Sequence, residues 1–338
     1  MSKYFEYTDE MNQLLAKAGS YDSNESLTAM AEIAKALELP LRKGVMDGDI
    51  LGGIFEAIQL APGATSEFPL DFLAPGTESE FVAYTIPNHG RIPERTVEGD
   101  YVMVPTYDIG ASIDFLLKYA RDARWDVVGR ATEVLQKSFV KKMNDDGWHT
   151  LLSAGADRNI LIYDADASNG TFSKRLVSLM KVVMRRNGGG NSSSVNRGQL
   201  TDLYISPEAE EDIRNFGVDE LDEVSRREVI TQEGGLLARM FGVNLHVLDE
   251  LGDGQEYNTY YLDDLSGTLP AGKQEIVVGL DLTNRDSFVM PVRQGVQIFE
   301  DPTLHRQRRA GMYGWAEQGF AALDTRRTLL GALYYLVI

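Results

Sequence analysis

The sequence predicts an α+β protein, in which strands are added after helices instead of alternating with them. Three observations predict this class: a long amphipathic helix over residues 125–152, a proline-rich stretch before it, and strand-like segments after it. No segment recurs with a period of 20–50 residues, so a repeat architecture is not indicated. The strand-like segments are 203–206, 243–248, 275–282 and 288–299.

The long helix is predicted by apolar residues that recur at steps of three or four. At about 1.5 Å per residue it would be roughly 40 Å long, so its apolar stripe needs a partner along its whole length. Gly147 weakens the helix propensity and is a candidate end of the regular part. The predicted core positions of this helix are Trp125, Val128, Leu135, Phe139 and Met143.

The segment before the helix predicts a long two-stranded excursion. Residues 80–86 and 101–105 read as strands, and residues 88–95 between them read as a charged turn. An isolated hairpin is only marginally stable in water, so this one must lie on its own body or on a neighbouring chain.

The first 60 residues read as an arm with helical pieces. Residues 26–37 have helical spacing, Asn24 or Ser26 is the candidate N-cap, and Pro40 is expected to end the helix. Two further helices are expected over residues 171–186 and 207–216.

Composition narrows the function classes. The chain has 338 residues, of which 43% are apolar, enough for a packed core. It has no cysteine, which excludes disulfides, thiolate zinc sites and cysteine nucleophiles. A net charge of −18 gives no global attraction to phosphate backbones or anionic lipid, and no apolar run is long enough to span a bilayer. The short basic clusters at residues 181–186 and 306–309 read as solvated faces.

No set of residues forms a catalytic or metal-binding motif. The four histidines are too far apart in sequence for a motif such as His-Glu-x-x-His, and there is no Gly-x-Ser-x-Gly elbow. His246 lies on a predicted strand between apolar residues and reads as structural. The glycine-rich stretch 187–194 lacks the Gly-Lys-Ser/Thr ending of a phosphate-binding loop. We therefore predict no catalytic residue, no metal site and no cofactor, and we do not expect an enzyme.

The order of several short segments resembles the major capsid proteins of tailed bacteriophages, which have the Hong Kong ninety-seven-like fold. Residues 112–117, the long helix and residues 145–155 are similar to that family's entry into and exit from its spine helix. The segment Asp-Leu-Tyr-Ile-Ser-Pro at 202–207 resembles its apical-domain strand and the following helix. Further similarities lie at residues 241–247, 278–282 and 314–324.

The resemblance implies a tailed-phage major capsid protein fold with a long spine helix, peripheral and apical domains, an extended β-hairpin loop and an N-terminal arm. The implied ranges are 1–60 for the arm, 61–103 for the extended loop, 104–199 with 300–338 for the peripheral domain, 125–152 for its spine helix, and 200–299 for the apical domain.

The resemblance also implies a structural function, which is self-assembly into hexamers and pentamers that close an icosahedral phage head around double-stranded DNA. The implied partners are further copies of the chain, a separate scaffold protein during assembly, the portal protein and, as a further candidate, a decoration protein. Only about 60 residues precede the loop, so we expect no scaffold segment within the chain and no processing. Because the chain is strongly acidic, it should enclose DNA without binding it strongly. The expected location is the virion, after assembly in the cytoplasm of the bacterial host.

The extended loop is expected to contact a neighbouring subunit. Its arginines lie beside acidic residues, which suits reciprocal ion pairs across an interface. Exposed pairs of this kind contribute only roughly 0–1 kcal/mol each, so apolar packing of phenylalanines should assist them. The predicted subunit-interface residues are Phe68, Phe72, Phe81, Arg91, Glu94, Arg95, Glu98 and Asp100.

Two alternative functions stay open at the level of the sequence. One is an encapsulin-like shell protein, whose nanocompartment encloses an enzyme cargo; the length of the chain and its N-terminal arm favour the phage shell instead. The other is an acidic soluble hydrolase, for which the adjacent pairs Asp145-Asp146 and Asp263-Asp264 would be the candidates. Adjacent acidic residues in loops and at helix ends are usually solvated or capping, which disfavours this reading.

We predict that subunits of the assembled shell are not cross-linked. Some relatives join subunits by an isopeptide bond between a lysine on the extended loop and an asparagine of a neighbour, but residues 44–117 contain no lysine. A guanidinium stays protonated and is a poor nucleophile, so Arg91 and Arg95 cannot replace that amine. Particles boiled in detergent should run as a single band near the chain mass of 37.5 kDa, and a ladder of covalent oligomers would contradict this.

Overall fold

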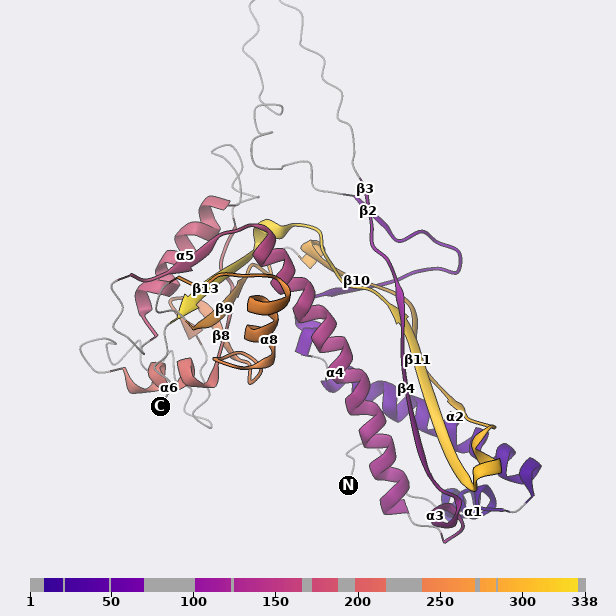
Figure 1. The fold of residues 1–338 in the computed structure, drawn as a ribbon. Helices are drawn as coiled ribbons and strands as arrows, with labels where there is room; N and C mark the ends of the chain where they lie inside the picture. Colours follow the sequence, from indigo (N-terminus) through magenta and orange to yellow (C-terminus); the bar gives the residue numbers. More distant parts are fainter. Residues whose placement is uncertain are drawn as a thin grey trace, which may run out of the picture. The chain divides into compact units, whose positions relative to one another are not determined.

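Figure 1 shows a computed structural model of the chain, in which the described residues divide into two compact units. The structure describes residues 9–20, 22–48, 50–69, 101–122, 125–165, 172–187, 198–216, 239–270, 274–283 and 285–333. The strand expected at residues 80–86 and the glycine-rich stretch 188–194 lie outside them. Within the described residues, unit 1 comprises 9–67, 103–147 and 289–321, and unit 2 comprises 68–69, 101–102, 148–288 and 322–333.

Unit 1 is built on a sheet with the strand order β1-β10-β11-β4, and β12 pairs with β10. β4 and β11 are antiparallel over ten residue pairs, from Tyr107 opposite Gln318 to Leu116 opposite Arg309. β1 is parallel to β10. The strands are β1 (Glu56–Gln59), β4 (Tyr107–Leu116), β10 (Phe288–Glu300), β11 (Arg309–Gln318) and β12 (Ala321–Ala322).

The N-terminal helices belong to the core of unit 1. α1 (Asp9–Ala18) and α2 (Ser23–Gly48) pack on each other, and Leu15 and Ile33 are fully buried in the same cluster as Phe139 of α4 and Met312 of β11. An arm was expected because the sequence of the first 60 residues does not show which residues their helices pack against. Their partners lie far along the chain, where a local pattern does not show them.

Two expectations for α2 are wrong. The helix continues through Pro40 to Gly48, because a proline removes one backbone hydrogen bond and weakens a helix without forbidding it. Its N-terminus is capped by neither candidate: the Asp22 Oδ1 accepts the Asn24 N–H at 3.0 Å, in the position of an N-cap. Ser26 is buried instead, and its hydroxyl donates to the Ala18 carbonyl at 2.6 Å, which joins α2 to α1.

The long helix is α4 (Trp125–Asp157), with 33 residues. Its residues 125–147 belong to unit 1 and its residues 148–157 to unit 2. Gly147 does not end it: a Cβ at this position would collide with the buried Leu51 side chain, 3.2 Å from its Cγ, so glycine permits a close approach inside an intact helix. Leu135, Phe139 and Met143 are buried, whereas the side chains of Trp125 and Val128 lie outside the described set.

Unit 2 contains a six-stranded mixed sheet with the order β5-β13-β9-β6-β8-β7, around which Figure 1 shows the helices α5, α6 and α8. The last part of α4 contributes Trp148, whose ring is 4.8 Å from the Tyr204 ring and 5.9 Å from the Tyr257 ring. The strands are β5 (Leu161–Tyr163), β6 (Asp202–Ile205), β7 (Arg239–Met240), β8 (Val243–Val247), β9 (Glu275–Leu280) and β13 (Thr328–Leu333).

The helices of unit 2 include two that were expected. α5 (Lys174–Asn187) buries Leu176 and Met180, and α6 (Pro207–Asn215) begins at an N-cap serine, Ser206, whose Oγ accepts the Ala209 N–H at 3.1 Å. α8 and the π-helical turn after it were not expected. The remaining short elements are α8 (Glu256–Thr259), the π-helix Tyr260–Asp264, α3 (Leu117–Arg121), β2 (Glu67–Pro69), β3 (Tyr101–Met103) and the 3₁₀ turns Ile50–Gly53, Arg285–Ser287, Leu304–Gln307 and Thr325–Arg327.

The two units divide the chain differently from the expected domains. Residues 148–199, expected in the peripheral domain, cluster with residues 200–288, and residues 289–299, expected in the apical domain, cluster with unit 1. Strand pairing explains the difference, since β13 lies between β5 and β9 and β10 pairs with β11. Such long-range pairing is not visible in a local sequence pattern.

We predict that Ile33→Ala lowers the free energy of unfolding by about 2–5 kcal/mol, because the substitution leaves a cavity in the core of unit 1. The neighbouring exposed Glu32→Ala is the control and should change it by less than about 0.5 kcal/mol. Urea denaturation followed by circular dichroism measures both. If Ile33→Ala were as stable as the control, the N-terminal helices would be a detached arm and not part of the core.

Candidate functional site

The predicted interface residues fall almost entirely outside the described part of the chain. Phe68, the exception, is a buried residue of β2. Near it, Val104 and Ser66 are joined twice: the Val104 N–H donates to the Ser66 carbonyl at 2.9 Å, and the Ser66 hydroxyl donates to the Val104 carbonyl. The two ends of the expected loop are therefore tied together at its base. The predicted residues outside the described set are Phe72, Phe81, Arg91, Glu94, Arg95, Glu98 and Asp100.

The sheet of unit 1 exposes an aromatic row on one face. Phe299 and Tyr313 are opposite each other on β10 and β11, with ring centroids 5.6 Å apart and exposed fractions of 37% and 39%. The Trp315 ring is 6.4 Å from that of Phe299. Because alternate residues point to opposite faces of a strand, the neighbours Ile298 and Met312 are buried in the core. Adjacent exposed aromatic rings are typical of a contact surface between proteins.

Ion pairs flank this aromatic row on the same sheet. Arg309 pairs with Asp114 at 2.7 Å, and Arg293 pairs with Glu317 at 3.1 Å. The Thr106 hydroxyl also donates to Glu317, at 2.8 Å. The side chains of Arg309 and Asp114 are both nearly half exposed, so their pair contributes only about 0–1 kcal/mol.

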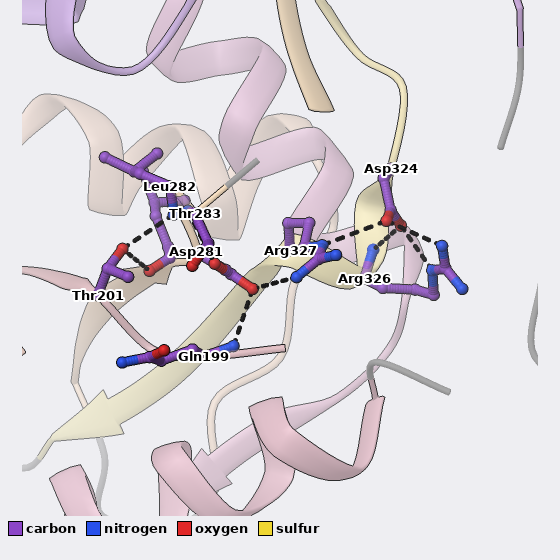
Figure 2. A network of polar contacts seen from close by, with 9 residues as sticks. Gln199, Thr201, Asp281, Leu282, Thr283, Asp324, Arg326 and Arg327 are labelled. Atoms are coloured by element: carbon purple, nitrogen blue, oxygen red, sulfur yellow. Dashed lines mark hydrogen bonds and ion pairs between the residues drawn. The ribbon is translucent and has the colours of Figure 1, made fainter. Parts of the chain in front are cut away.

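A buried network of charges lies in unit 2, between the end of β9 and the turn before β13 (Figure 2). Asp281 is fully buried and forms an ion pair with Arg327, whose side chain is 5% exposed. The Nε of Arg327 also lies 3.4 Å from the Asp324 carboxylate. Arg326 holds that carboxylate through two bonds of 2.7 and 2.9 Å, an arrangement that matches the forked shape of a guanidinium.

Backbone amides complete the network on the other side of Asp281. The Gln199 N–H donates to its Oδ2 at 2.8 Å, and the Thr283 N–H donates to its Oδ1 at 3.0 Å. Burial alone would raise the pKa of Asp324, but the hydrogen bonds and charge of Arg326 outweigh it, so this pKa lies below its ordinary value. The charges are compensated and fixed, which suits a structural role and leaves no group ready to transfer a proton.

Asp146, one of the candidate acids, and His246 also have ordinary partners. Asp146 accepts from the Tyr107 hydroxyl and from the Lys142 ammonium, both at 2.8 Å. His246 lies 2.8 Å from the Asp202 carboxylate and stacks on the Tyr204 ring at 4.8 Å. Burial raises the pKa of Asp202, but its hydrogen bonds, with that to His246 the strongest, bring it below its ordinary value. Throughout the described residues, no group of three or more His, Asp and Glu side chains is placed to hold a metal ion.

Glu275 is a buried titratable group that no sequence motif marks. It begins β9, has no exposed surface, and neither carboxylate oxygen has a hydrogen-bond partner of normal geometry among the described residues. Burial raises its pKa to about 8; the nearby Ser206 hydroxyl opposes this shift, and the charges of Glu208, Asp212 and Asp253 add to it. One feature of the sequence could have indicated this buried carboxyl group: Glu275 is the only charged residue of the otherwise apolar strand Glu-Ile-Val-Val-Gly-Leu.

Comparison with solved structures identifies the fold. A structure from Microbacterium phage Oxtober96 covers 85% of this chain and 91% of its own, with 11% identity and a TM-score of 0.57. The capsid asymmetric unit of cyanophage Pam1 covers 83% and 88%, with 14% identity and a TM-score of 0.55. The capsid of an empty GTA particle covers 85% and 90%, with 13% identity and a TM-score of 0.54.

The chain has the fold of the major capsid proteins of tailed bacteriophages. No protein-family model and no curated protein matches it, so the likeness is carried by the fold and not by the sequence. In this capsid fold α4 corresponds to the expected spine helix. None of the helices in the described ranges is both long and apolar enough to cross a bilayer.

We predict that Arg327→Met destabilises the capsid fold by about 3–5 kcal/mol, because it leaves the Asp281 carboxylate buried without its counter-charge. The matched control is Arg309→Met, which breaks an exposed pair and should cost less than about 1 kcal/mol. Denaturant unfolding of both variants tests this. The double variant Asp281→Leu/Arg327→Met should recover part of the lost stability. If Arg327→Met and Arg309→Met lowered the free energy of unfolding equally, the buried network would not stabilise the fold more than an exposed pair does.

We also predict that stability falls as pH rises from about 4.5 to about 8. In this window the unfolded chain releases the Glu275 proton while the folded chain retains it. The contribution of the protonated carboxyl group to stability is therefore complete at low pH and is lost as pH rises through the folded pKa of about 8. Glu275→Gln should flatten the profile and be more stable than the wild type at pH 8. Urea titrations between pH 5 and pH 8 measure this, with the exposed Glu211→Gln as control. A wild-type slope retained in Glu275→Gln would refute the assignment.

Proposed function

We propose that this chain is the structural subunit of a closed protein shell, the major capsid protein of a phage head. The observation that carries the proposal is the fold, which matches capsid structures over 83–85% of this chain and 88–90% of theirs. In this role copies of the chain assemble into hexamers and pentamers around double-stranded DNA, and the protein is located in the virion.

The surface chemistry supports a structural role. The described residues bring no catalytic set together: Asp146 is held by Tyr107 and Lys142, and His246 by Asp202. By contrast, apolar side chains such as Phe299 and Tyr313 are exposed on an ordered sheet, and assembly would bury such area. The net charge of −18 repels a phosphate backbone, so contacts between subunits, and not DNA, would stabilise the shell.

The proposal includes the extended loop as a contact between subunits. The two hydrogen bonds between Ser66 and Val104 support this part of the proposal, because they join the chain before residue 70 to the chain after residue 100. A scaffold protein during assembly, a portal protein at one vertex and a decoration protein on the outside are the further partners of this proposal. An encapsulin-like shell differs in its content, which would be an enzyme and not DNA.

We predict that the purified protein forms capsomers or shells in the megadalton range near neutral pH, visible by negative-stain microscopy and light scattering. Deleting residues 71–99, while keeping the Ser66–Val104 base, should leave circular dichroism and unfolding unchanged and abolish closed shells. Nucleic acid inside particles supports the phage head, and an enzyme cargo supports the nanocompartment. A monomer at all salt and protein concentrations would overturn the proposal.

A further inference from the structure

Unit 1 contains a recess lined by positive charge in an otherwise acidic chain. It has a volume of about 500 Å³, and five of its lining side chains are basic: Lys118, Arg121, His305, Arg306 and Arg308. None of the described residues that line it is acidic. The sequence predicts a solvated face at residues 306–309, but in the structure Lys118 and Arg121, about 190 positions earlier in the sequence, line the same recess. We call this site the basic recess.

The fold brings these cations together through the β4–β11 ladder. β4 ends at Leu116, which is opposite Arg309 at the start of β11, so α3 and the 3₁₀ turn Leu304–Gln307 lie at the same end of the ladder. The Leu117 N–H donates to the Arg308 carbonyl at 3.0 Å. Gly19 closes the recess beside α3: a Cβ on it would lie 2.6 Å from the Arg121 Cβ and nearer still to the Arg121 backbone.

Two cations of the basic recess lack a counter-charge among the described residues. The guanidinium groups of Arg306 and Arg308 have no ion-pair partner within the described ranges, and Arg121 has a half-exposed pair with Asp122 at 3.6 Å. Arg308 also has a left-handed backbone, with φ 56° and ψ 37°, a conformation that a long side chain rarely adopts. The His305 Nε2 is shielded from solvent and has no partner in the described structure.

Like charges that converge on a recess repel one another unless an anion joins them. A phosphate group suits this density of donors better than a carboxylate, because it carries up to two charges and several oxygens that can accept from different side chains at once. Guanidinium groups bind phosphate oxygens bidentately, and 500 Å³ lies within the range of small-ligand pockets.

We propose that the basic recess is a binding site for phosphate groups, supplied either by a free polyphosphate or nucleotide or by a nucleic-acid backbone. This inference goes beyond the proposed function and does not depend on it, since binding is measured per chain whether or not shells form.

The test is isothermal titration calorimetry of the full chain with sodium tripolyphosphate. The variant Arg306→Gln/Arg308→Gln removes two cations from the recess, and Arg175→Gln/Arg186→Gln removes two exposed cations from α5 as the matched control. The wild type and the control should bind one tripolyphosphate per chain, more weakly as salt is added. The recess variant should bind at least tenfold more weakly. If that variant has a changed melting temperature, Lys118→Gln on α3 provides the same test.

Two further titrations separate the sources. A 20-base-pair DNA duplex that binds the wild type, is displaced by tripolyphosphate and is lost in the recess variant would assign the site to the nucleic-acid backbone. Tripolyphosphate binding without duplex binding would assign it to a free polyphosphate. Equal binding by the recess variant and the control would overturn the proposal. So would binding of a polyglutamate peptide without tripolyphosphate, which would make the recess a protein contact.

Discussion

A 33-residue helix with an apolar stripe must be covered along its whole length, and the rest of the structure meets this constraint. In unit 1, Leu135 and Phe139 of α4 lie in a core that includes the N-terminal helices and the inner faces of β4, β10 and β11. In unit 2, Trp148 packs against Tyr204 and Tyr257. Both units therefore use the same helix as a core element, and each supplies its own cover.

Charge is organised in two ways in this acidic chain. The Asp281–Arg327 pair is buried and fully compensated, and it joins the end of β9 to the turn before β13, so removing either partner leaves an isolated buried charge. Glu275 is buried without a counter-charge, and burial raises the pKa of its carboxyl group to about 8. The basic recess is the reverse case, since Arg306 and Arg308 have no ion-pair partner among the described residues. A net charge of −18 describes none of these local arrangements.

The sequence predicted features that leave a periodic local signal. The helix α4, the helix α5 and the strands β6, β8, β9 and β10 were expected close to where the structure has them, and the capsid fold was implied by the resemblance that short segments in this order carry. Local propensity predicted helix ends at Pro40 and Gly147 that the structure does not have. The helix α2 continues through Pro40, and Gly147 lies inside α4, where it allows the Leu51 side chain to approach closely. Strands as short as β5, with three residues, leave too little pattern to detect. The pairing of Arg327 with Asp281 could not be expected, because the two residues are 46 positions apart, and Lys118 lines the same recess as Arg306, almost 190 positions later.

The pairing of β4 with β11 has a consequence for how the protein is made. It joins residues about 200 positions apart, and β13, near the end of the described chain, lies between β5 and β9. Contacts of such high sequence separation form slowly, and neither sheet is complete until β11 and β13 have left the ribosome. Until then α1, α2 and α4 expose the apolar faces that later form the core, and such exposed faces make a nascent chain prone to aggregation.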